Sequence, residues 1–71
     1  MPTRTAQRQD IIDRAQDARR TAMDMLDLSL AKGEMTREEV ARWMDLIFRC
    51  RSLADIMKLK AMVSTMTGLN L

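Results

Sequence analysis

The sequence predicts an all-α protein, an antiparallel helical hairpin of two long helices, and three observations support this. Apolar residues recur at steps of three and four in both halves of the chain, the spacing of one helix face. Lys32 and Gly33 separate the two halves as a helix stop. No stretch of useful length alternates apolar and polar residues as a strand would. We therefore expect one helical-hairpin domain over residues 1–71.

The first helix is expected over about residues 5–31. One face is apolar and the opposite face is charged, which is typical of a helix that lies half-buried on a core. Asp10 and Arg14 have the spacing of an ion pair on the charged face. The apolar face includes three alanines, small enough to let another backbone approach closely, and consists of Ile11, Ile12, Ala15, Ala18, Ala22, Met25, Leu26 and Leu30.

The turn is expected over 32–36 and the second helix over about 37–66. Glycine tolerates the left-handed conformation that closes a helix, so Gly33 predicts the end of the first one. Thr36 and Glu39 have the spacing of a capping box, which predicts the start of the second. Residues 37–66 contain no glycine or proline, and a short tail over 67–71 follows Thr67 and Gly68.

The second helix carries more apolar surface than one neighbouring helix can cover. One seam is suited to packing against the first helix and consists of Trp43, Ile47, Cys50, Ala54, Met57 and Ala61. Further apolar residues lie on a flank rotated away from this seam, among them Val40, Met44 and Phe48. A homodimeric four-helix bundle would cover both surfaces, and a heterodimer with another helical protein meets the same demand.

Length and composition also favour association over chemistry. A core this small supplies only about 3 to 5 kcal/mol, so such chains usually need disulfides, a metal or a second subunit. With one cysteine and no histidine, neither an intrachain disulfide nor a usual zinc site is expected. The absence of histidine and of a glycine-rich phosphate loop argues against an enzyme, and no cofactor or small-molecule substrate is expected.

The leading functional hypothesis is a small non-enzymatic protein–protein interaction module. It would be a dimeric regulator, inhibitor or chaperone-like adaptor that binds a further protein through a methionine-rich helical surface, since eight methionines provide adaptable contacts. The residues expected at its protein interfaces are Val40, Trp43, Met44, Ile47, Phe48, Leu59, Met62 and Met66.

The alternative hypothesis is a regulator that binds nucleic acid through the basic residues of the second helix. In architecture the predicted hairpin resembles the Rop-type RNA-binding dimers, although no sequence motif is shared, and that resemblance implies RNA as a ligand. The candidate phosphate contacts are Arg42, Arg49, Arg51, Lys58 and Lys60.

A soluble, cytoplasmic protein is expected. The first ten residues are polar and lack the apolar core of a secretory signal. Charged residues interrupt the most hydrophobic stretch, so no segment reaches the roughly 20 apolar residues that span a bilayer.

Overall fold

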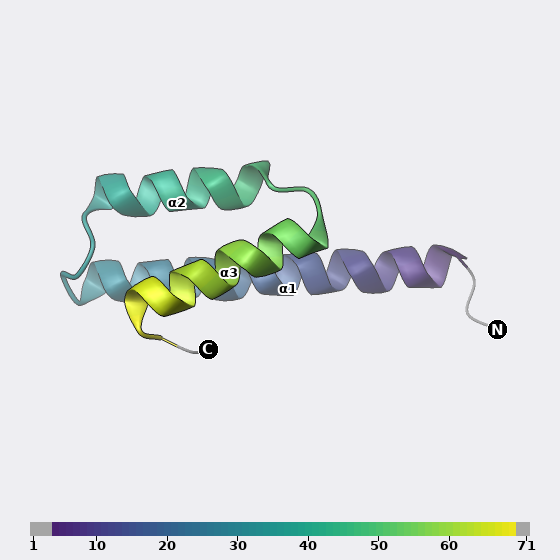
Figure 1. The fold of residues 1–71 in the computed structure, drawn as a ribbon, viewed down its shortest axis with the longest axis horizontal. Coiled ribbons are helices and arrows are strands. Elements are labelled where there is room, and N and C mark those ends of the chain that lie inside the picture. Colours follow the sequence, from purple (N-terminus) through teal and green to yellow (C-terminus); the bar gives the residue numbers. More distant parts are fainter. Residues whose placement is uncertain (1–3, 70–71) are drawn as a thin grey trace.

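The computed structural model describes residues 4–69, with side chains from residue 8 onward, and confirms the all-helical class. It contains three helices, α1 (Arg4–Ala31), α2 (Arg37–Arg49) and α3 (Leu53–Thr67). Along α1, α2 runs back in the opposite direction, and α3 then returns parallel to α1 (Figure 1). Both shorter helices pack on α1, whereas α2 and α3 make few backbone contacts with each other. Residues 70 and 71 of the expected tail lie outside the described residues.

The turn between α1 and α2 is specified by its own residues. Gly33 has a φ of +75°, and its N–H donates to the carbonyl of Leu30 at 3.0 Å. The N–H of Glu34 donates to the carbonyl of Ser29 at 3.0 Å, which completes the hydrogen-bond pattern of a Schellman motif. The predicted helix stop therefore closes α1 as expected.

The capping box predicted at the start of α2 is confirmed in both of its halves. The Glu39 N–H donates to the Thr36 hydroxyl at 3.2 Å. The Thr36 N–H donates to the Glu39 carboxylate, also at 3.2 Å. Two backbone N–H groups that would lack a partner at the helix start are thus satisfied.

The prediction of one continuous helix over 37–66 is wrong, because the chain bends between α2 and α3. Cys50 and Ser52 have extended backbone angles, with ψ values of 130° and 143°. The Ser52 hydroxyl accepts a hydrogen bond from the Asp55 N–H at 3.1 Å and caps α3. The Arg19 guanidinium, from α1, donates to the Cys50 carbonyl at the end of α2.

The physical reason for the bend is the position of the apolar residues on each side of it. Ile47 and Ile56 are each 1% exposed and lie nine residues apart. At 3.6 residues per turn, a continuous helix would point them in directions about 180° apart. A single α1 can cover both side chains only if the chain turns between them.

The core is formed on one face of α1. The larger cluster contains Ala22, Met25 and Leu26 from α1, which pack with Met35 of the turn, Val40 and Ile47 of α2 and Val63 of α3. A second cluster joins Ala15 and Ala18 to Ile56 of α3. The small alanine side chains let another backbone come close, as the sequence predicts, and that backbone belongs to α3 of the same chain.

Two parts of the predicted core are exposed in the structure. Ile11 and Ile12, expected on the buried face, are 52% and 47% exposed, because the first turns of α1 extend beyond α2 and α3 (Figure 1). The seam expected to continue through Ala54, Met57 and Ala61 is also exposed, since α3 buries Ile56 and Val63 instead. We call residues 8–14 the α1 overhang.

Among the described residues, none of the helices combines the length and the apolar character that crossing a bilayer requires.

Candidate protein interface

The structure divides the eight predicted interface residues into three groups. Val40 and Ile47 lie in the core of the single chain, so they present almost no surface to a partner. Trp43, Met44 and Leu59 are half-buried and pack against that core. The other three are exposed: Phe48, Met62 and Met66. The accessible part of Trp43 lies on the same surface as Met62 and Met66, whereas Phe48 lies on another.

The first surface is a shallow groove where α2 meets α3. We call it the α2–α3 groove. It encloses about 470 Å³ and is lined mainly by apolar atoms. Its lining residues are Trp43, Lys58, Ala61, Met62, Thr65 and Met66. Three of the predicted interface residues are therefore brought together at one place.

Local helix geometry explains how the α2–α3 groove arises. Met62 and Met66 are four residues apart, so they lie one above the other on the same side of α3. They are 46% and 45% exposed, and Leu59, on the same side, packs inward. Trp43 lies one turn from the buried residues of α2 and is half-buried, so part of its ring packs on the core and part faces the groove. Lys58 contributes the one charged side chain of the lining.

Phe48 lies on a different surface. Its side chain is 65% exposed and borders a depression formed with the polar side of α1, next to Arg19, Arg20, Met23, Asp24 and Asp27. Charges of both signs surround the ring. The predicted patch of Val40, Met44 and Phe48 is thus not a single exposed surface, since Val40 is buried, Met44 is half-buried and Phe48 is exposed.

The five basic residues considered for nucleic-acid contacts do not form one patch. Arg49, at the end of α2, pairs with Asp45 at 3.1 Å. Arg51 is exposed in the bend between α2 and α3, and Arg42 is exposed on α2. Lys58 borders the α2–α3 groove, whereas Lys60 borders a depression between α3 and α1.

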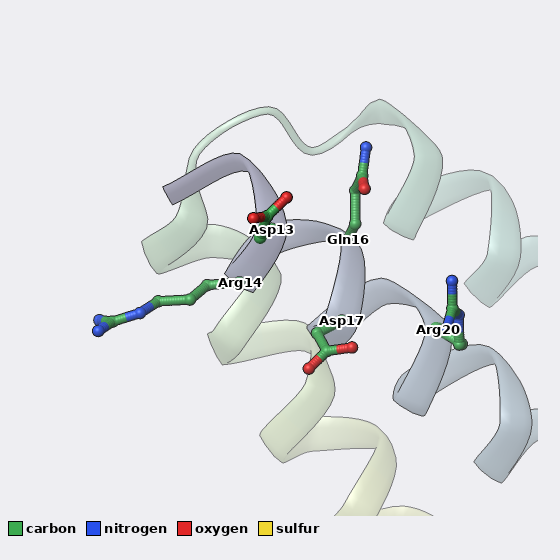
Figure 2. Close-up of a pocket in the computed structure, with 5 residues that line it drawn as sticks. All are labelled: Asp13, Arg14, Gln16, Asp17 and Arg20. Carbon is green, nitrogen blue, oxygen red and sulfur yellow. The ribbon is translucent and has the colours of Figure 1, made fainter. Parts of the chain in front are cut away.

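The charged side of α1 carries a further depression, shown in Figure 2. It is lined by Asp13, Arg14, Gln16, Asp17 and Arg20. These side chains diverge: Arg14 points away from the others, and Asp17 points to the opposite side from Gln16 (Figure 2). Arg14 forms its expected ion pair with Asp10, at 3.2 Å. In residues 4–69 no group of three or more cysteine or acidic side chains is placed to hold a metal ion.

Sequence reasoning missed the residues that make the bend, and with it the shape of the α2–α3 groove. One signal was available, because Ser52 and Asp55 have the spacing of a helix start, as Thr36 and Glu39 do. Arg19 gave no such signal, since its contact with Cys50 joins residues 31 positions apart. Leu46, 47% exposed on α2, is a further apolar surface residue not included in the predicted interface.

Residues 4–69 fold into three helices, and an apolar groove lies between the two shorter ones. No family model, curated protein or solved structure matches this chain.

Proposed function

We propose that this chain is a non-enzymatic protein–protein interaction module acting in the cytoplasm, a small dimeric regulator, inhibitor or adaptor. It pairs with a second copy and binds a helix of another protein in the α2–α3 groove. The observation that carries this proposal is the convergence of Trp43, Met62 and Met66 on one accessible apolar surface. Contiguous exposed apolar surface of this kind typically marks an interaction site.

The chemistry of the α2–α3 groove favours an amphipathic helix as its ligand. Helices dock by placing apolar side chains, spaced three and four residues apart, into a hydrophobic groove. Methionine side chains adapt to the shape of such a ligand, and tryptophan is the residue most enriched among energetically dominant interface positions. Lys58 at the edge favours a ligand helix that carries an acidic residue beside its apolar face.

The test uses two charge substitutions on the same helix. Met62→Glu places a carboxylate in the α2–α3 groove, whereas Met57→Glu places one on another side of α3 at nearly the same exposure, 47% against 46%. Helical peptides selected for binding to the wild-type protein from an amphipathic library are titrated into each variant by calorimetry.

We expect Met62→Glu to weaken binding at least about tenfold, because burying a charge against apolar side chains is costly. Met57→Glu is expected to bind like the wild type. Equal affinity of the two variants for every selected peptide would contradict the proposal. Circular dichroism of both variants confirms that the helices remain formed.

A further inference from the structure

The bend between α2 and α3 is not imposed by the residues that form it. Residues 37–67 contain no glycine or proline. Within residues 4–69, positive φ angles occur only at Gly33 and Gly68, both outside the bend. Cys50, Arg51 and Ser52 could therefore adopt helical angles without steric penalty, and α2 and α3 would then form one straight helix.

A straight helix would place the buried face of α2 and the buried face of α3 on opposite sides. Ile47 of α2 and Ile56 of α3 are both 1% exposed and would point about 180° apart. Val40 shares the face of Ile47 and Val63 shares the face of Ile56, and these two valines would point about 140° apart. Such a helix could keep α2 on its own α1 while α3 presents its apolar face to a second molecule.

The surface that α3 would leave is already complementary to α3. It consists of Ala15, Ala18 and Ala22 with the side chains beside them, which Ile56 and Val63 cover in the single chain. The α3 helix of a second copy has identical residues and can remake every one of these contacts. Exchange of identical elements is a low-cost route to dimers for this reason.

The α1 overhang supplies an independent observation. Ile11 and Ile12 are uncovered in the single chain, although Ile11 continues the line of Ala15 and Ala18. Because α3 runs parallel to α1 (Figure 1), an α3 that continues straight from α2 keeps its present packing only on the α1 of a second copy in the opposite orientation. The straight helix, antiparallel to its own α1, also extends along the α1 overhang and so lies beside these isoleucines.

We propose that two copies of this chain form a dimer by exchanging α3, with residues 50–52 straightened into a continuous helix. The α2–α3 groove is then built from both copies, Trp43 from one and Met62 and Met66 from the other. The dimer holds two such grooves, related by its two-fold axis. This inference rests on the proposed pairing of two copies and specifies how that pairing occurs.

The experiment detects exchange by cross-linking between chains. Asp17 and Lys60 border the same depression between α1 and α3. Two single-cysteine proteins are prepared in a Cys50→Ser background, one with Asp17→Cys and the other with Lys60→Cys. They are unfolded together, refolded at high concentration, separated by size and treated with a short bismaleimide. Exchange predicts that the dimer fraction yields the mixed cross-linked product.

Two substitutions are expected to shift the equilibrium between the monomer and the exchanged dimer in opposite directions. Leu53→Pro places proline at the first residue of α3, where the preceding ψ of 143° at Ser52 accommodates it, but proline inside a straight helix is strongly unfavourable. We expect it to lower the dimer fraction about tenfold or more relative to Leu53→Ala, which loses the same side chain. Ser52→Ala removes the cap that only the bent form uses and should raise the dimerisation constant about tenfold.

The outcomes separate this inference from the proposed function. A dimer that gives no mixed product, or one that Leu53→Pro leaves unchanged, contradicts exchange while the pairing of two copies stands. A wild-type protein and a Ser52→Ala variant that both stay monomeric at all concentrations contradict both. Should Leu53→Pro fail to fold, an unchanged dimerisation constant in Ser52→Ala still overturns the exchange.

Discussion

The two junctions between helices are stabilised by different kinds of interaction. The first, residues 32–36, is specified locally by Gly33, by the hydrogen bonds that close α1 and by a complete capping box at Thr36. The second, residues 50–52, has half of a capping box and a hydrogen bond from Arg19 on another helix. A junction of the first kind can be predicted from neighbouring residues, whereas one of the second kind depends on the packing of α3.

The largest loss of folding stability is expected when the packing that maintains the second junction is removed. Ile56→Ala deletes a buried side chain of α3 and should lower the free energy of unfolding by about 2 to 5 kcal/mol. Leu46→Ala, at an exposed apolar position of α2, should change it by no more than about 0.5 kcal/mol. Urea unfolding followed by circular dichroism measures both. Similar losses in the two variants would contradict the assignment of the core.

The first junction is expected to lose stability when its glycine is replaced. Gly33 has a positive φ and nothing lies within 4 Å of a Cβ added there, so Gly33→Ala costs only backbone strain, about 1 to 2 kcal/mol. Gly68 has the same conformation and equally open surroundings, but it lies at the end of the last helix, where fraying relieves the strain. Thermal melting should therefore show a clearly smaller loss for Gly68→Ala. A neutral Gly33→Ala would indicate that the turn is not locally specified.

A smaller effect is expected from the contact that joins α1 to the bend. Arg19→Ala removes the hydrogen bond to the Cys50 carbonyl and should cost about 1 kcal/mol. Arg20→Ala, at the next and exposed position, is the matched control and should be nearly neutral. The same urea titrations compare the pair. Equal free energies of unfolding in the two variants would show that Arg19 does not stabilise the second junction.

The smallest effect is expected at the surface close to that junction. Arg49→Ala breaks an ion pair whose side chains are 77% and 58% exposed, so stability should change by no more than about 0.5 kcal/mol. Gel-shift titration of the same variant addresses the nucleic-acid hypothesis. Binding of structured RNA or duplex DNA that weakens with salt and in Arg49→Ala would favour the nucleic-acid hypothesis over protein binding in the α2–α3 groove.

Much of the fold could be predicted from the sequence because it depends on local chemistry. The helix stop at Gly33 and the capping box at Thr36 are formed by residues within a few positions of each other. The bend was missed because residues 50–52 are all compatible with a helix. The Ser52 cap is a local signal for a helix start, but the need to place Ile47 and Ile56 on one α1, which makes the chain turn there, is tertiary.

The candidate site was predicted in part for the same reason. Met62 and Met66 share a side of α3 whatever its neighbours are, so their pairing followed from spacing alone. Their position beside Trp43 requires the bend. Val40 and Ile47, also assigned to an interface from the sequence, are buried in the core of the single chain, where the predicted seam already places Ile47.

The position of Trp43 has a practical consequence. It is the chain's single tryptophan, and there is no tyrosine, so the ultraviolet emission of the unlabelled protein comes from this one indole. Because the ring is partly buried and borders the α2–α3 groove, a ligand that displaces water there should shift the emission to shorter wavelength. The native protein thus carries its own optical reporter at the surface where we expect a partner.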